Sequence, residues 1–254
     1  MAPISYKAWA HPAPKAALLL VHGLGGNSSW WEPAGNFFLE KNLSSYAIDL
    51  RHHGSFEEFF QAIKELVRII KRENSNDKIF TIGESMGALI ILSMALKDQD
   101  LFDGLACISP AFKSKVPLKF PDYIKIFFPL LYEPGKRHTL PATPDMCTRD
   151  PIYLKMIEST YDKDVMQSSM VLFNIFIAQI YIGFFRMDIR SPILFLIAGD
   201  DKLVYSSVSK KVFDRLNAKD KTLIEYPDMY HSLSIELGRE KVFEDIAKWI
   251  DRRI

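Results

Sequence analysis

Short, continuous apolar runs recur along the 254-residue chain, and segments with helical periodicity lie between them. The runs that we interpret as strands are residues 17–22, 46–50, 78–83, 104–109, 192–199 and 222–226. Strands that are apolar on both faces are typical of parallel sheets, because crossover helices cover both sides of such a sheet. The alternation therefore predicts an α/β protein with a mostly parallel central sheet flanked by helices. A ligand would bind at the carboxyl ends of its strands.

The segments between these runs are predicted to be helices over residues 55–72, 86–97, 206–217 and 238–253. In the first of them Phe56, Ile63 and Ile70 fall on one stripe, as expected of a helix that packs one face against a sheet. Residues 5–9 are expected to add one antiparallel strand at the edge of the sheet.

The alternation is interrupted once, between residues 109 and 192. This stretch contains eight prolines and two very apolar helical segments, residues 123–131 and 166–185, with no good strand candidate. At about eighty residues it is too long for a loop. We predict that residues 111–189 form an inserted helical cap over the carboxyl edge of the sheet, while residues 1–110 and 190–254 form the core.

The charge balance argues against partners that are held by bulk electrostatics. Lys and Arg total 32 against 31 Asp and Glu, a formal net charge of +1, so no basic surplus favours nucleic acid or an anionic membrane surface. Cys107 and Cys147 are too few for a disulfide framework, and the chain has no CxxC pair that would indicate a metal or redox site. A small-molecule substrate is the expected partner.

Neither a secretory leader nor a membrane span is expected. The N-terminal region lacks a charged segment followed by an apolar run of about 7 to 15 residues. The most hydrophobic window, residues 171–185, is shorter than the roughly 20 residues that cross a bilayer, and it contains Asn174 and Gln179. We expect a cytoplasmic enzyme, and the sequence leaves its oligomeric state open.

The sequence GESMG at residues 83–87 lies between a strand candidate and a helix candidate. A GxSxG pattern in that place is typical of a nucleophile elbow, where glycines let the backbone bend sharply and expose the serine hydroxyl. The pentapeptide alone would occur by chance in roughly one chain in ten of this length. Ser85 is our candidate nucleophile, provided that the chain also supplies a base, an acid and an oxyanion hole.

Two backbone N–H groups are needed to bind the oxyanion that forms when a serine attacks an ester. One is expected from Met86, the residue after the nucleophile. The other is expected from the glycine-rich loop HGLGG at residues 22–26, with Leu24 as the candidate.

The base and the acid are expected later in the chain, in the order serine, acid, histidine. His231 lies between the last strand candidate and the last helix, and it is the only histidine after Asp201. Asp200 and Asp201 both follow the strand candidate 192–199, where a carboxylate can orient the histidine and stabilise its imidazolium. The residues alone leave these two open. The other histidines are expected to be structural or on the surface: His11, His22, His52, His53 and His138.

Taken together, these motifs resemble the α/β-hydrolases of the monoacylglycerol lipase and lysophospholipase group. The chain is also similar to bacterial carboxylesterases and to the serine aminopeptidase (S33-type) hydrolase family. The resemblance rests on HGLGG at 22–26, DLRHHGS at 49–55, GESMGA at 83–88, DKLV at 201–204 and YH at 230–231. TRDP at 148–151 and YDKDV from residue 161 resemble the lysophospholipase-type cap. The family's acid is the aspartate of a DxxV sequence, so the resemblance implies Asp201.

Two departures from the family pattern stand out. The segment after Ser55 enters a helix without the longer loop that usually follows this motif, and Ala88 replaces a second glycine. Neither touches the inferred chemistry, although the missing loop could reshape one wall of the pocket.

The resemblance implies the α/β-hydrolase fold and a serine carboxylic-ester hydrolase with the triad Ser85, Asp201 and His231, an oxyanion hole at Leu24 and Met86, and no metal or organic cofactor. Medium- to long-chain acyl esters such as monoacylglycerols are the expected substrates, because the cap is rich in large apolar residues. Some of these would seal the cap against the sheet and the others would line an acyl tunnel: Phe120, Tyr123, Ile124, Phe127, Phe128, Phe173, Phe176, Ile177, Ile180, Phe184 and Phe185.

Three alternatives stay open from the sequence. The first is a short-chain carboxylesterase, with no preference for long acyl groups. The second is an aminopeptidase of the same superfamily, which would need an acidic cluster in the cap to bind a free amino terminus. The residues available for such a cluster are Asp145, Asp150, Glu158, Asp162 and Asp164. The third is a ligand-binding protein on a hydrolase scaffold.

Overall fold

The computed structural model describes residues 4–50, 54–74, 78–116, 118–164 and 166–254. A seven-stranded sheet forms its centre, in the order β1-β3-β2-β4-β5-β8-β9. The strands are β1 (Ser5–Trp9), β2 (Ala16–Val21), β3 (Leu43–Asp49), β4 (Ile79–Glu84), β5 (Gly104–Ile108), β8 (Ile193–Ala198) and β9 (Lys221–Tyr226). β1 is antiparallel to β3, and the other neighbours are parallel. The predicted α/β class and the antiparallel edge strand are confirmed.

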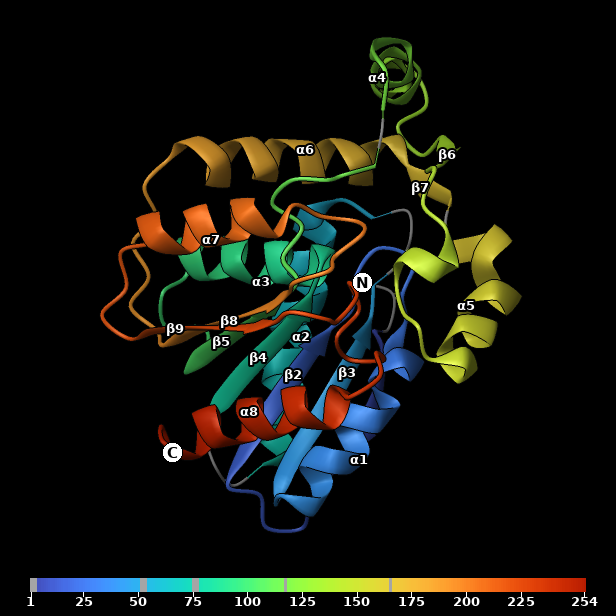
Figure 1. The fold of residues 1–254 in the computed structure, drawn as a ribbon. Helices are drawn as coiled ribbons and strands as arrows, with labels where there is room; N and C mark the ends of the chain where they lie inside the picture. The colour runs from blue at the N-terminus through green and yellow to red at the C-terminus, as the bar shows by residue number, and fades with distance from the viewer. Residues whose placement is uncertain (1–3, 51–53, 75–77, 117, 165) are drawn as a thin grey trace.

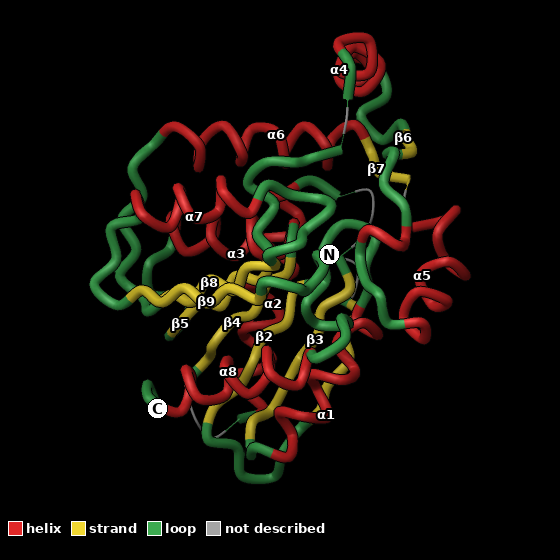
Figure 2. The backbone as a smooth tube through the Cα atoms, viewed as in Figure 1, coloured by secondary structure: helices red, strands yellow, loops and turns green. Residues whose placement is uncertain are grey.

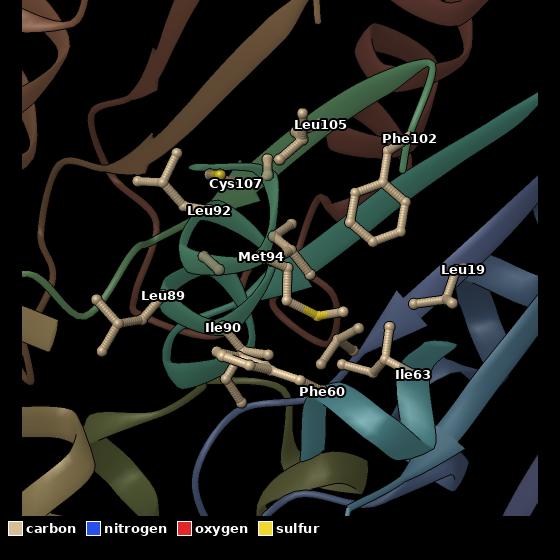
Figure 3. Close-up of a cluster of buried hydrophobic side chains, with 14 of the residues drawn as sticks. Leu19, Phe60, Ile63, Leu89, Ile90, Leu92, Met94, Phe102, Leu105 and Cys107 are labelled. Carbon is tan, nitrogen blue, oxygen red and sulfur yellow. The ribbon is translucent and has the colours of Figure 1, made fainter. Parts of the chain in front are cut away.

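Helices cover both faces of this sheet, as Figure 1 shows. α1 (Glu32–Glu40) and α8 (Arg239–Asp251) pack on one face with the side chains of Leu18 and Phe80. α2 (Phe56–Glu73), α3 (Met86–Lys97) and α7 (Ser206–Arg215) pack on the other. Figure 3 shows part of this second layer, where Leu19 and Leu105 of the sheet meet helical side chains.

The helix boundaries follow local sequence signals. Ser55 begins α2 with a capping box: its side chain accepts the N–H of Glu58, and the Glu58 side chain accepts the N–H of Ser55. α3 is buried over most of its surface, which explains why its sequence is apolar all round rather than on one stripe.

Between β5 and β8 the chain forms a separate group of elements. These are α4 (Phe120–Phe127), the 3-10 turn η2 (Phe128–Leu131), β6 (Arg137–Thr139), η3 (Pro144–Met146), α5 (Pro151–Asp164), β7 (Met166–Ser168) and α6 (Ser169–Phe184). Figure 1 shows α6 above α3 and α7, with α4 standing off beyond it and α5 at the side. We propose that this group is the cap, and its boundaries at residues 111 and 189 stay a prediction.

The structure differs from the sequence prediction at α1, at α5 and at the pair of short strands β6 and β7. α1 was not predicted, because Pro33 and Gly35 interrupt its short apolar pattern. α5 was also not predicted. Residues 166–168, expected to be helical, instead form β7, which pairs antiparallel with β6 before Ser168 caps α6 by accepting the N–H of Val171.

Gly35 is required by packing, since a Cβ there would lie 2.2 Å from Cδ2 of Trp9. A glycine that weakens the helical signal is thus what lets α1 lie against the edge strand. A short 3-10 helix, η1 (Ser28–Trp31), directly precedes α1.

Candidate active site

Ser85 sits alone between the last residue of β4 and the first residue of α3. Its φ of 56° and ψ of −112° are rarely adopted by a residue with a side chain, and such strain costs on the order of 1–3 kcal/mol. The N–H of Ser85 donates to the carbonyl oxygen of Ile108 at 2.9 Å, and its own carbonyl oxygen accepts the N–H of Ala111 at 3.2 Å. The end of β5 and the segment that follows it therefore hold the strained turn in place.

The two glycines of the motif are needed because backbone segments meet at the elbow. A Cβ at Gly87 would lie 2.1 Å from the carbonyl oxygen of Val21, and one at Gly83 would lie 2.6 Å from the carbonyl carbon of Gly87. Neither position has room for a side chain unless the backbone moves. This packing presses the start of α3 against the end of β2.

The glycine-rich loop after β2 lies directly beside Ser85. A Cβ at Gly23 would be 3.0 Å from the Cβ of Ser85, so the loop approaches as closely as glycine allows. Leu24 and Met86 both line the cavity that Ser85 faces. The N–H of Met86, as the first residue of α3, has no acceptor within the helix and is available to an anion.

His22 fixes the shape of this loop. Its Nδ1 lies 2.7 Å from the carbonyl oxygen of Gly23, and its Nε2 accepts the N–H of Leu50 at 3.0 Å. These partners require the proton on Nδ1, and the side chain is buried. The structural role predicted for His22 agrees with these contacts.

His231 and Asp201 form a buried pair at the carboxyl edge of the sheet. Nδ1 of His231 lies 2.7 Å from Oδ2 of Asp201. The other carboxylate oxygen, Oδ1, accepts the N–H groups of Leu203 and Val204, each at 2.8 Å. Asp200 is exposed and pairs with Lys202 instead. The loop after β8 thus turns one of its two neighbouring carboxylates inward and the other outward.

Burial and charge act in opposite directions on this pair. Burial alone would lower the pKa of His231, but the charge and hydrogen bond of Asp201 and the charge of Glu84 outweigh it and raise the pKa. Burial would raise the pKa of Asp201, but the charge and hydrogen bond of His231, with the two backbone donors, lower it. A proton on the imidazole is therefore stabilised inside the protein.

A cavity of about 420 Å³ opens in front of Ser85 and His231, within the range of small-molecule sites. Its wall is mostly apolar, and α6 contributes Leu172, Ile175, Phe176 and Gln179, which share one helix face. Gln179 Nε2 donates to the carbonyl oxygen of Ala111 at 2.8 Å and so ties α6 to the segment that follows β5.

The structure shows which of the apolar cap residues line the cavity, a division that the sequence leaves open. Of the apolar cap residues named from the sequence, Tyr123, Phe127 and Phe176 line it, together with Ile126 and Leu172, which were not named. Others project into solvent, Phe120 and Phe184 most of all, at 77% and 80% exposure. Composition shows that a segment is apolar, but the helix face decides which side chains reach the cavity.

Glu84 is the residue that sequence reasoning missed. It lines the cavity, is 3% exposed, and accepts hydrogen bonds from the N–H and the hydroxyl of Ser234. The available signal was a charged residue at the variable position of GxSxG, directly after an apolar strand.

Other residues named from the sequence either have partners outside this cavity or are not described by the structure. His138 in β6 has its Nε2 2.8 Å from the hydroxyl of Ser169. Arg51, His52 and His53 are outside the described residues, as are the side chains of Asp162 and Asp164. Asp150 accepts hydrogen bonds from Arg239 and from the N–H of Ile152, so it caps the N-terminus of α5.

Within the described ranges no group of three or more His, Cys, Asp or Glu side chains could hold a metal ion. Cys147 lines the cavity, but burial raises the pKa of its thiol to about 12, so it is not a thiolate at neutral pH. Across the residues that the structure describes, none of the helices has the length and hydrophobicity to cross a bilayer.

The fold is that of an α/β hydrolase, with Ser85 on the turn after β4 and with Asp201 and His231 on the loops after β8 and β9. The chain belongs to the serine aminopeptidase S33 family, which matches residues 12–238. The fold and the family predicted from the sequence are confirmed.

Two curated relatives match nearly all of this chain, but the match covers very different shares of their own lengths. An uncharacterized abhydrolase domain-containing protein of Dictyostelium discoideum is 25% identical over 99% of this chain, which spans only 28% of that protein. Phospholipase YtpA of Bacillus subtilis is 22% identical, and the match covers 97% of this chain and 99% of YtpA.

Two solved structures share the fold. The monoacylglycerol lipase of Paleococcus ferrophilus superposes with a TM-score of 0.86 at 22% identity, over 99% of this chain and 100% of that one. A soluble variant of monoglyceride lipase from Saccharomyces cerevisiae, in complex with a substrate analog, has a TM-score of 0.85 at 18% identity, over 98% of this chain and 92% of that one.

Proposed function

We propose that the protein is a serine ester hydrolase whose substrates are medium- to long-chain acyl esters such as monoacylglycerols. One observation carries the proposal: Ser85, on a strained elbow, shares an apolar cavity with a histidine that is paired to a buried aspartate. A histidine and a carboxylate arranged in this way activate a serine hydroxyl for acyl transfer.

The proposed reaction assigns one role to each of these groups. His231 takes the proton of the Ser85 hydroxyl as the oxygen attacks the ester carbonyl carbon. The N–H groups of Leu24 and Met86 bind the oxyanion of the tetrahedral intermediate. Collapse of this intermediate breaks the bond to the alcohol, which leaves with the proton from His231. Water then attacks the acyl-enzyme with His231 again as base, and the acid is released.

The substrate class is inferred from the cavity and the relatives. The apolar wall contributed by α4 and α6 suits an acyl chain better than a polar group. The relatives include proteins named as a phospholipase and as monoacylglycerol lipases, which favours an acyl-glycerol type of ester over other esters.

Among the residues whose side chains the structure describes, the cavity lacks the acidic cluster that the aminopeptidase alternative needs. Among the described residues that line the cavity the acidic side chain is Glu84, and Ser234 already satisfies both of its oxygens. Asp150 is engaged by Arg239, and neither Asp145 nor Glu158 lines the cavity.

A chain-length series tests the substrate class. Initial rates are measured with nitrophenyl esters from acetate to long acyl chains, and with monoacylglycerol. Each methylene that enters the cavity adds up to about 0.8 kcal/mol, so kcat/KM should rise severalfold per carbon until the cavity is full. A flat profile would favour the short-chain carboxylesterase and contradict the proposed substrate, and the absence of hydrolysis throughout would favour a binding protein.

A further inference from the structure

Glu84 is a buried carboxylate next to the candidate nucleophile, at a position where the elbow itself requires none. The sharp turn needs the glycines at 83 and 87, and the chemistry needs Ser85, but the residue between Gly83 and Ser85 is free to vary in a GxSxG pattern. A buried carboxylate is costly unless it is hydrogen-bonded, so its presence at 3% exposure calls for a specific partner.

That partner is Ser234, which belongs to the loop that carries His231. The N–H of Ser234 donates to Oε1 of Glu84 at 3.0 Å, and its hydroxyl donates to Oε2 at 2.8 Å. Ser234 is fully buried and lies three residues beyond His231. Both carboxylate oxygens are thus used to join the end of β4 to the histidine loop.

The charge of Glu84 acts on the histidine as well. The titratable groups that act on its carboxyl are His231 on the loop after β9, which lowers its pKa, and Asp201 on the loop after β8, which raises it. Burial is the largest influence on Glu84 and raises the pKa of its carboxyl overall, while the two bonds from Ser234 offset part of that rise. On the segment after η3, burial and the charge of Glu84 both raise the pKa of the Cys147 thiol.

Glu236, in the same loop, provides a comparison. It is as deeply buried as Ser234, but its carboxylate meets a cation: Oε1 lies 2.9 Å from Nε of Arg149, and Oε2 accepts the N–H of Arg149 at 2.9 Å. Glu84 receives its hydrogen bonds from an uncharged serine instead, so the negative charge that it carries when ionised acts on the imidazole of His231.

We propose that Glu84 is a positioning residue that fixes the His231 loop through Ser234 and, with Asp201, stabilises the protonated His231 that forms during the attack. The proposal rests on the proposed function for its catalytic consequence, but the effect on His231 is measurable without turnover.

The first test is the pH profile of kcat/KM for Glu84→Gln. Glutamine keeps the size and the hydrogen-bonding capacity of the side chain and removes its charge. We expect the midpoint of the acidic limb to fall by about one pH unit and the plateau to fall about tenfold. Glu236→Gln is the matched control, and its midpoint should stay at the wild-type value. A wild-type midpoint in Glu84→Gln, or an equal shift in both variants, would overturn the proposal.

The second test follows the imidazole of His231 by NMR in the purified protein, with its signal assigned through His231→Asn. Its pKa should be lower in Glu84→Gln than in the wild type, and unchanged in Glu236→Gln. An unchanged pKa in Glu84→Gln overturns the proposal even if the enzyme is active. A lowered pKa in a protein without hydrolase activity supports Glu84 and rejects the proposed function, so the two failures are distinguishable.

If Glu84→Gln does not fold, as judged by circular dichroism, Ser234→Ala replaces it. This variant keeps the carboxylate but removes one of its donors, which leaves Glu84 protonated up to a higher pH. The pKa of His231 should then fall in the same direction by a smaller amount. No change in the pKa of His231 in Ser234→Ala would count against the proposal.

Discussion

The two carboxylate oxygens of Asp201 have separate partners. Oδ1 is held by the N–H groups of Leu203 and Val204, while Oδ2 faces Nδ1 of His231. The loop therefore fixes the carboxylate by itself, and the histidine is oriented by a group that is already in place. The neighbouring Asp200, exposed and paired with Lys202, has no such arrangement.

Asp201→Asn tests this difference through the pH dependence. His231 must be neutral to act as a base, so activity falls as pH drops below its pKa, which in the folded protein is raised above the ordinary value of about 6.5. Without the Asp201 charge, burial dominates, and the acidic limb should move to lower pH while kcat falls by about 10^4. The measurement is kcat/KM against pH for a soluble ester.

Asp200→Asn is the matched control for that experiment and should keep the wild-type profile. A loss of activity in Asp200→Asn with a wild-type profile in Asp201→Asn would reverse the assignment.

These two aspartates also show which site residues can be predicted from the sequence and which cannot. The residues alone allow either aspartate, and the preference for Asp201 came from a resemblance to a known family. Glu84 was missed because its partner, Ser234, is distant in sequence.

At the scale of elements, the sequence predicts best those that are buried on both sides. The parallel strands and α3 are continuous apolar runs, so their existence and type are visible without the structure. α1 was missed because its Gly35 serves the packing of Trp9 rather than the helix. The sequence pattern places residues 166–168 at the start of α6, because a strand of three residues, such as β7, has too little pattern of its own.

Substitutions on the two faces of α6 test whether the acyl chain binds along the face that lines the cavity. Leu172 lines the cavity, whereas Ile177 does not and is 47% exposed. Leu172→Trp should shorten the preferred acyl chain, with a loss for the longest esters on the order of tenfold for every two methylenes excluded. Rates with acetate esters should change little. The measurement is the same chain-length series.

Ile177→Trp is the control, since it adds the same side chain on the outer face of α6, and it should keep the wild-type profile. If both variants behave alike, or if Leu172→Trp leaves the long esters unaffected, the acyl chain does not bind along this face of α6.

At the scale of the whole molecule, the sheet brings together residues that are far apart in the chain. Ser85 follows β4, Asp201 follows β8 and His231 follows β9, and parallel strands place all three at one edge of the sheet. Figure 2 shows the loops that gather at this edge, below α6. The order of strands and motifs predicts this meeting of residues, but the shape of the cavity depends on which side chains of α4 and α6 face inward.

The account depends on Ser85 being a nucleophile that His231 activates. The most direct measurement is covalent labelling of the purified protein with a fluorophosphonate, followed by peptide mass spectrometry. We predict a single adduct on Ser85 that is absent from Ser85→Ala and forms far more slowly in His231→Ala. Hydrolysis of acyl esters by Ser85→Ala, or labelling at another residue with Ser85 unmodified, would contradict the account.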